Sequence, residues 1–307
     1  MPETFRMITV FGSTVLDQIG AVPRLPARGE TVVGGSFTVA AGGKGANQAL
    51  AACRAGRRVR FISAVGDDPF GTQALALLRK DGVDLELVKT VKEPTGIGMI
   101  VVDSGGENAI AVLPGANRAV SESDAERALD GMRAGSILMM QEEIPAESNR
   151  RALELARKRG VRTLFNTAPF LDTTTELAKQ ASIVIANEVE FGALCHTSGA
   201  SLDEAMQDHA RANEQIVIVT LGPGGARAAT GTEIFHAPAA AILAVDTVGA
   251  GDTFCGYLAA GLDAGVGLEA AMHRAAIAAS LTCLKRGAQP AIPWSKEVDI
   301  FAATLTP

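Results

Sequence analysis

Short apolar runs alternate with amphipathic stretches along most of this chain, and this alternation limits the folds that the chain can adopt. Most of the apolar runs are followed by a helical pattern, of which residues 146–159 are an example. Buried strands that alternate with helices form a mostly parallel sheet, so the sequence predicts an α/β fold. The predicted strands are 7–11, 59–63, 136–140, 161–165, 182–186 and 216–221.

Two segments interrupt the alternation, because they have strand-like patterns with no helical stretch between them. They cover residues 30–40 and 95–112, and small residues break each of them, at Gly34 in the first and at 104–106 in the second. Glycines at such positions are typical of turns between strands. The two segments are therefore predicted as strands outside the βαβ alternation.

Composition and charge indicate an enzyme that acts on small molecules. With 307 residues, of which 47% are hydrophobic, the chain can bury a large core, and we expect one α/β domain across residues 1–307. The net charge of −6 and the absence of a Lys/Arg block argue against nucleic acid or an anionic membrane as a partner. No apolar run approaches the roughly 18 residues of a membrane span. Residues 1–11 lack a signal-peptide pattern, so a cytoplasmic protein is expected.

The cysteines and histidines have no spacing typical of a metal site or a redox motif. The cysteines are far apart, mostly within apolar helical stretches, and we predict buried, reduced thiols. The histidines form no i, i+4 pair, so a zinc site is not expected. The residues concerned are Cys53, Cys195, Cys255, Cys283, His196, His209, His236 and His273.

Residues 245–254 run from an apolar strand pattern through three small residues into an acid that opens a helical pattern. Gly249, Ala250 and Gly251 have little or no side chain, so their backbone N–H groups can surround an anion at the positive end of the helix. Asp252 would lie at the rim of this nest, where a carboxylate can accept the proton of an attacking hydroxyl. The run indicates phosphoryl transfer, although a helix with an ordinary acid in its first turn has the same pattern.

A second glycine-rich run, at residues 41–49, precedes an alanine-rich helical stretch. Its glycines allow the backbone to approach a small polyhydroxyl ligand, while Lys44 and Asn47 supply donors and an acceptor for sugar hydroxyls. The alternative is a glycine-rich helix start with a solvated lysine. A further polar and glycine-containing run, 65–71, follows at the end of the next predicted strand.

Together these runs resemble the two signatures of the ribokinase-like (PfkB) sugar kinases, and the resemblance extends from Gly12 to Pro293. It implies a Rossmann-like fold of three αβα layers, with a small β-sheet lid at about 13–41 and 95–113 that covers the sugar and excludes water. The edge strands of such a lid need cover, which a second subunit often supplies, so a homodimer through the lid is expected. ATP and Mg²⁺ are the implied phosphoryl donor and metal cofactor.

The nucleotide site does not have the Walker A pattern, because Lys44 is followed by glycine rather than by Ser or Thr. The resemblance places the nucleotide at the glycine-rich turn after the strand 216–221, at the carboxyl ends of the strands. It also assigns Asn187 and Glu190, in an Asn-x-x-Glu motif, to phosphate binding and to Mg²⁺ through water. A bare β-turn and a helix cap are the respective alternatives. The implied nucleotide ligands are Asn187, Thr220, Gly222, Gly224, Gly225 and Gly251.

The resemblance draws the acceptor site from separate parts of the chain. The implied residues are Asp17, Gly43, Lys44, Gly45, Asn47, Glu143 and Asp252. For Glu143 and its neighbour Glu142, a solvated loop is the alternative. In the implied mechanism, Asp252 takes the proton of the primary hydroxyl, which attacks the γ-phosphorus of ATP in line. The N–H groups of Gly249, Ala250 and Gly251 stabilise the charge that develops.

The chain departs from the family pattern after the first strand, where Val15 stands in the position of a usual asparagine. A ribose hydroxyl buried against valine would lose water without replacement, which costs about 1 to 3 kcal/mol. D-ribose, phosphorylated on its 5-hydroxyl, is the expected acceptor, and Val15 makes 2-deoxyribose an alternative. A Val15 side chain that points into the core would leave ribose unaffected.

The resemblance also implies activation by K⁺ next to the anion hole. Its ligands, mostly backbone carbonyls, would be Asp246, Val248, Thr282, Lys285 and Gly287. Ala291 replaces a usual serine, which removes one possible ligand. Ala276 replaces a histidine that lies near adenine in some relatives, and this leaves purine selectivity open.

Two other functions stay open from the sequence. A nucleoside kinase of the same fold would need a larger, more aromatic pocket to stack a base. The chain has one Trp, one Tyr and 11 Phe, and they are not gathered in the signatures. A non-catalytic sugar or nucleotide sensor would need no base, whereas Asp252 and its glycine nest are intact.

Overall fold

The computed structural model describes residues 7–195 and 201–305, and within these ranges nine strands form the main sheet. Their order is β13-β12-β11-β10-β9-β8-β1-β4-β5, and the pairs are parallel except for β11 with β12 and β12 with β13. All six strands predicted from the apolar runs are present. The strands are β1 Ile8–Phe11, β4 Val59–Gly66, β5 Val88–Val91, β8 Ile137–Met140, β9 Arg162–Asn166, β10 Ile183–Asn187, β11 Ile216–Thr220, β12 Ala226–Ala229 and β13 Ile234–Ala237.

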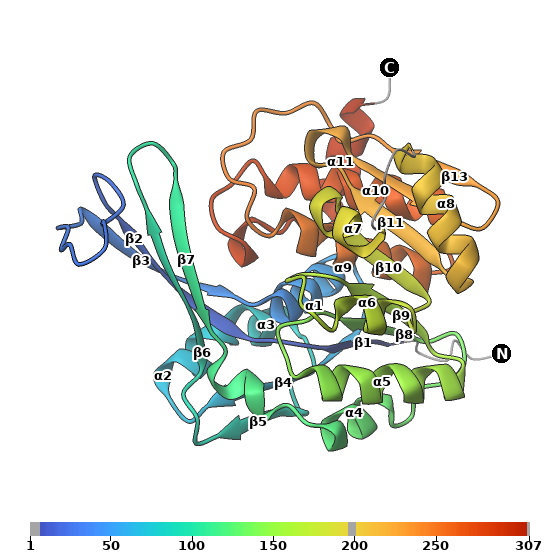
Figure 1. Cartoon of the computed structure of the whole chain (residues 1–307), viewed down its shortest axis with the longest axis horizontal. Helices are drawn as coiled ribbons and strands as arrows, with labels where there is room; N and C mark the ends of the chain where they lie inside the picture. Colours follow the sequence, from blue (N-terminus) through green and yellow to red (C-terminus); the bar gives the residue numbers. More distant parts are fainter. Residues whose placement is uncertain (1–6, 196–200, 306–307) are drawn as a thin grey trace.

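The main sheet separates two hydrophobic cores, because successive side chains of a strand point to opposite faces. In β1, Ile8 and Val10 belong to one core and Phe11 to the other. Helices α1, α3, α9, α10 and α11 pack on the first face and α4 to α8 on the second, so the predicted three αβα layers are confirmed (Figure 1). The helices are α1 Lys44–Arg54, α2 Pro69–Ala74, α3 Ala76–Asp81, α4 Glu122–Leu129, α5 Ala146–Arg159, α6 Thr174–Ala178, α7 Glu188–Cys195, α8 Leu202–Asn213, α9 Ala250–Asp263, α10 Leu268–Thr282 and α11 Ser295–Leu305.

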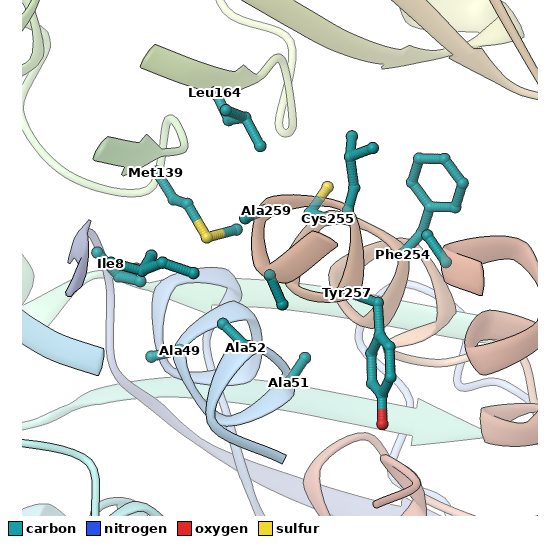
Figure 2. Packing of buried hydrophobic residues seen from close by; sticks show 14 of the residues in the cluster. Ile8, Ala49, Ala51, Ala52, Met139, Leu164, Phe254, Cys255, Tyr257 and Ala259 are labelled. Atoms are coloured by element: carbon teal, nitrogen blue, oxygen red, sulfur yellow. The ribbon is translucent and has the colours of Figure 1, made fainter. Parts of the chain in front are cut away.

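Helices α1 and α9, which carry the two signatures, lie against each other on the first face. Their contact is close because Gly256 of α9 has no side chain, and a Cβ there would lie 2.4 Å from the Cβ of Ala51. Figure 2 shows Ala51 and Ala52 of α1 beside the helix that carries Tyr257 and Ala259. The packing of small residues brings the first turns of both helices to the same region.

A second sheet of four strands, in the order β3-β2-β6-β7, is formed by residues in the described ranges. It extends away from the main sheet (Figure 1), and the predicted small β-sheet is therefore confirmed. The β2–β3 and β6–β7 pairs are antiparallel, whereas β2 and β6 are parallel. The strands are β2 Val15–Ala21, β3 Ser36–Gly42, β6 Gly96–Val102 and β7 Asn108–Leu113.

The predicted boundaries of these strands are right in one segment and wrong in the other. The 95–112 segment forms β6 and β7, joined by a turn in which Gly106 N–H donates to Asp103 O at 3.1 Å. The 30–40 segment begins its strand only at Ser36. Residues 30–35 belong to the loop between β2 and β3. Gly35 N–H donates to Ala21 O at 2.9 Å, and this hydrogen bond joins the last residue of β2 to the residue before β3.

The four predicted thiols are free, but their predicted burial is wrong for three of them. Cys255 is buried, whereas Cys53, Cys195 and Cys283 are partly exposed because they lie at helix ends, where the chain leaves the core. His196 lies outside the described residues. In the part of the chain that the structure describes, no three His, Cys, Asp or Glu are placed to hold a metal ion, and no helix is both long and apolar enough to cross a membrane.

Candidate active site

Helix α9 begins at the predicted anion nest. Gly249 precedes it with a φ of +78°, a left-handed conformation that favours glycine, and a Cβ there would lie 2.9 Å from the Cβ of Ala288. The N–H groups of Gly251 and Asp252 lie in the first turn, where they have no partner inside the helix. Ala250 N–H instead donates to Thr247 O at 3.3 Å. Two of the first-turn N–H groups and the positive end of α9 therefore face the same point.

Asp252 is buried, with 7% of its surface exposed, and two amides of α1 hold its carboxylate. Asn47 Nδ2 donates to Oδ2 at 2.9 Å, and Gln48 Nε2 donates to Oδ1 at 3.0 Å. Asn47 was among the predicted site residues, but Gln48 was not. The signal for Gln48 was its polarity in an otherwise alanine-rich helix, directly beside Asn47.

Lys44, at the start of α1, lies close to several carboxylates. Burial by itself lowers the pKa of Lys44, but the attraction of nearby carboxylates outweighs this effect and the pKa is raised. These carboxylates are those of Asp252, Glu143 and Glu190. Lys44 is therefore cationic at neutral pH and can attract a phosphoryl group.

Glu143 is tied to the other two acceptor segments, so the solvated-loop interpretation of this acidic pair is wrong. Its Oε2 accepts from Ser13 Oγ at 2.5 Å and from Lys44 N–H at 2.9 Å. Glu142 is 3% exposed and accepts a short hydrogen bond from the hydroxyl of Thr174. Burial raises the pKa of Glu142 to about 7, although hydrogen bonds from threonine hydroxyls act in the opposite direction.

Asp17 lies in β2, between β3 and β6, and each of these two strands has a glycine beside the Asp17 carboxylate. A Cβ on Gly42 would lie 2.4 Å from its Oδ2, and a Cβ on Gly98 would lie 2.2 Å from its Oδ1. Burial and, to a lesser extent, the charge of Glu143 raise the pKa of Asp17 to about 6. The second sheet therefore leaves space for this carboxylate.

The predicted glycines at the start of α1 allow it to approach closely the segment that joins β1 to β2. A Cβ on Gly43, whose φ is +90°, would lie 2.7 Å from Val15 N, and a Cβ on Gly45 would lie 2.5 Å from Ser13 N. Val15 itself is 3% exposed and belongs to neither hydrophobic core. Since side chains alternate along a strand, Val15 is on the same face of β2 as Asp17.

A cavity of about 590 Å³ lies beside the start of α9, at the carboxyl ends of β10 and β11. The predicted nucleotide residues Asn187, Thr220, Gly222, Gly225 and Gly251 line it, together with Ala276. Gly224 is in the same turn, but it is not among the lining residues. The sequence analysis missed the segment 239–242, which forms one wall, because it has neither a strand nor a helix pattern.

The chain matches the model of the pfkB family carbohydrate kinases over residues 6–295. It belongs to the PfkB carbohydrate kinase family. It is therefore a ribokinase-like, ATP-dependent phosphotransferase that acts on a sugar.

Three relatives of this PfkB kinase show how close the similarity is. Ribokinase of Schizosaccharomyces pombe is 35% identical over 95% of the chain and 96% of the relative. Deoxyribokinase of Salmonella typhi is 32% identical over 93% of the chain and 95% of the relative. The structure of Arabidopsis thaliana ribokinase complexed with ribose and ATP has a TM-score of 0.86 and 32% identity, and the match covers 96% of the chain and 98% of that structure.

In this PfkB kinase the Asn-x-x-Glu motif forms a reciprocal cap at the start of α7. Asn187 Oδ1 accepts from Glu190 N–H at 2.8 Å, and Glu190 Oε2 accepts from Asn187 N–H at 3.0 Å. Thr167 Oγ1 also donates to Glu190 Oε2, at 2.9 Å. The helix cap that the motif predicts as an alternative is present. Both hydrogen bonds that the Glu190 carboxylate accepts end on Oε2, so its Oε1 suits contact with metal-bound water.

Two loops of the PfkB kinase meet at Asp246, beside the anion nest. Its Oδ1 accepts from Val248 N–H at 3.0 Å and its Oδ2 from Gly287 N–H at 2.8 Å. Lys285 N–H donates to Thr282 O at 3.2 Å. The predicted K⁺ ligands therefore lie in the loop before α9 and at the end of α10 with the loop that follows it, with a carboxylate between them, and such a donor set of oxygens suits a monovalent cation. Ala291 is buried and contributes no oxygen from its side chain.

Proposed function

We propose that the protein transfers the γ-phosphoryl group of ATP to the 5-hydroxyl of D-ribose, giving ribose 5-phosphate and ADP. The observation that carries this proposal is the position of Asp252. Its carboxylate lies at the first turn of α9, and Asn47 of the acceptor motif donates to it at 2.9 Å. A general base between an anion nest and a sugar-binding motif is what transfer to a hydroxyl requires.

In this mechanism Asp252 accepts the proton of the primary hydroxyl while its oxygen attacks the γ-phosphorus in line. The bond from the γ-phosphorus to the bridging oxygen breaks, and ADP leaves. The N–H groups of Gly251 and Asp252 and the cationic Lys44 stabilise the equatorial oxygens as charge moves across them. Asp17 and Glu143 accept hydrogen bonds from the sugar hydroxyls and orient the attacking group.

Two cations complete the proposed reaction. Glu190 would hold Mg²⁺ through water, and the ion would offset negative charge on the phosphates of ATP. A K⁺ ion held by Asp246 and the carbonyls of Val248, Thr282, Lys285 and Gly287 would keep the loop before α9 in place.

The 2-deoxyribose alternative is supported by a specific observation, the burial of Val15 outside both cores and on the face of β2 that carries Asp17. A valine at the acceptor neither donates nor accepts a hydrogen bond, so it does not compensate a ribose hydroxyl for the water that it loses. Similarity to both ribokinases and a deoxyribokinase is compatible with either acceptor.

ATP consumption with D-ribose, 2-deoxy-D-ribose, fructose and adenosine, in Mg²⁺ and K⁺, tests the acceptor. A higher kcat/KM for ribose than for the other three supports the proposal, and a preference for 2-deoxyribose supports the alternative. The Val15→Asn variant is expected to raise the ribose to 2-deoxyribose ratio of kcat/KM about 10-fold, because asparagine restores a hydrogen bond.

The control for this experiment is Ile19→Asn, on the same face of β2 but four residues farther along. Its acceptor ratio should stay that of the unmodified protein. An unchanged ratio in Val15→Asn would show that Val15 does not contact the acceptor.

A homodimer through the second sheet is the proposed assembly. Phe37 of β3 is 66% exposed and Met99 of β6 is 50% exposed. The pairing of β2 with β3 and β6 places both side chains on the same face as Gln18, opposite to Asp17. An apolar sheet face of this kind is stabilised when a second copy covers it.

The Phe37→Asp, Met99→Asp double variant is expected to convert the dimer to a monomer in sedimentation velocity experiments. Two charges buried without partners at the interface would oppose association. Ile300→Asp, which changes an exposed residue on α11, is the control and should leave the mass unchanged. A monomeric parent protein, or a dimeric double variant, contradicts this assembly.

A further inference from the structure

Gln48 is a buried amide that no step of the proposed mechanism uses. Its side chain, 1% exposed, lies one residue after Asn47 in α1 and reaches the carboxylate of Asp252. Nε2 donates to Asp252 Oδ1 at 3.0 Å and to Asn166 Oδ1 at 3.2 Å, while Oε1 accepts from Gln141 Nε2 at 2.7 Å. Both N–H groups and the carbonyl of Gln48 therefore have partners.

The neighbours of Gln48 determine which way its amide faces. Asn166 Nδ2 donates to Ile185 O at 3.1 Å, so Asn166 presents its oxygen to Gln48. Gln141 presents its nitrogen. A reversed Gln48 amide would place its oxygen against the oxygens of Asp252 and Asn166. The surroundings therefore permit only the orientation that donates to Asp252.

The support for Gln48 comes from the main sheet and not from the acceptor site. Gln141 directly follows β8, and Asn149 Nδ2 donates to its backbone carbonyl at 2.7 Å. The amide of Gln141 has room because Gly12 has no side chain, and a Cβ there would lie 1.9 Å from Gln141 Oε1. Asn166 is the last residue of β9. The ends of two strands of the main sheet thus hold Gln48.

We propose that Gln48 is a positioning residue that fixes the carboxylate of Asp252 in its reactive orientation and stabilises the ionised form. The proposal rests on the proposed role of Asp252 as the base. Asn47 contacts the other carboxylate oxygen but also belongs to the acceptor motif, so sugar hydroxyls compete for it. Gln48 keeps the orientation when Asn47 turns to the substrate.

The test is the pH dependence of kcat/KM for D-ribose in Gln48→Met, which keeps the unbranched shape and removes the donor. Without this donor the charged form of the Asp252 carboxylate loses a hydrogen bond, so we expect the acid limb of the profile to move to higher pH. Other ionisable groups interact electrostatically with Asp252 from α1 and α9. Lys44 of α1 and Cys255 of α9 are among them, and Glu143 and Glu190 act on Lys44 in turn.

The expected results are an about 10- to 100-fold lower kcat, because the carboxylate loses its reactive orientation, and an acid limb displaced to higher pH, with KM for ATP within threefold of the unmodified protein. Gln215→Met is the matched control, because Gln215 is also a buried amide, 5% exposed against 1% for Gln48, and its Nε2 donates to Ala178 O, outside the site. Its kcat and acid limb should not change. Gln141→Met is the second variant if Gln48→Met does not fold, and it should move the acid limb in the same direction by removing the donor that orients Gln48.

An unchanged acid limb in the folded variants overturns the proposal, even if kcat falls, since a merely structural role lowers activity equally at all pH values. Asp252→Asn separates this failure from that of the proposed function. If Asp252→Asn is inactive but Gln48→Met has the parent pH profile, only the role of Gln48 is wrong. If Asp252→Asn stays fully active, the role of Asp252 is wrong and that of Gln48 is overturned with it.

Discussion

Asp252→Asn is expected to lower kcat for phosphoryl transfer by about 10²- to 10⁴-fold, the usual contribution of a general base. Asparagine has the size of aspartate but cannot take the proton of the attacking hydroxyl. Its amide nitrogen would also face one of two donors, Asn47 Nδ2 or Gln48 Nε2, that now contact carboxylate oxygens. The loss should therefore appear in kcat for every acceptor.

Nucleotide binding should survive this substitution, because Asp252 is not among the residues that line the 590 Å³ cavity. Initial rates with D-ribose and ATP measure the first effect, and calorimetric titration with ADP measures the second. Asp299→Asn, on the surface of α11, is the control and should retain the parent rate. Full turnover in Asp252→Asn would refute the assignment of the base.

Arg54→Met is expected to lower the free energy of unfolding by about 3 to 5 kcal/mol, because it leaves a buried carboxylate without its partner. Arg54 Nε donates to Asp81 Oδ2 at 2.7 Å, and the two side chains are only 7% and 5% exposed. Nη1 also donates to the carbonyls of Gln289 and Ile292, at 2.9 and 2.7 Å. The guanidinium carbon lies 5.3 Å from the centre of the Trp294 ring.

Urea unfolding followed by circular dichroism measures this change. Arg211→Met is the control, since the Arg211–Asp208 pair is 63% and 75% exposed and should contribute less than about 1 kcal/mol. A change below about 1 kcal/mol in Arg54→Met would mean that water reaches Asp81 and the two carbonyls. Arg54 also binds the carbonyls of Gln289 and Ile292, which follow Ala288, the residue that packs against Gly249. The same variant therefore tests whether Arg54 holds this segment in place.

Six of the nine strands of the main sheet could be predicted because their signal is local, whereas β5, β12 and β13 at its two edges were missed. The predicted strands are mostly apolar, although Arg60 and Arg162 interrupt two of them, because both faces of a central parallel strand are buried, and such runs are recognisable within a few residues. The second sheet gives a weaker signal because many of its side chains are exposed. In β2, an apolar start gives way to half-buried polar residues, and Phe37 of β3 points to solvent.

The site was predictable only where its residues are neighbours in the sequence. Asp252 and its glycines form one run, and Lys44 and Asn47 form another, so local patterns and the family resemblance could identify them. Glu142 and Glu143 show the limit of this reasoning. They are adjacent and chemically alike, yet one is buried against Thr174 and the other contacts Ser13 and the start of α1.

Local sequence patterns specify the alternation of strands and helices, the two glycine-rich helix starts and the acid at the second of them. All of these depend on residues close together in the chain. The tertiary structure decided which groups surround Asp252. Gln48, Gln141 and Asn166 come from α1 and from the ends of two strands, and their hydrogen bonds exist only after the sheet has formed and α1 has packed against α9. No local pattern encodes such a set, because the distances that create it join residues more than ninety positions apart.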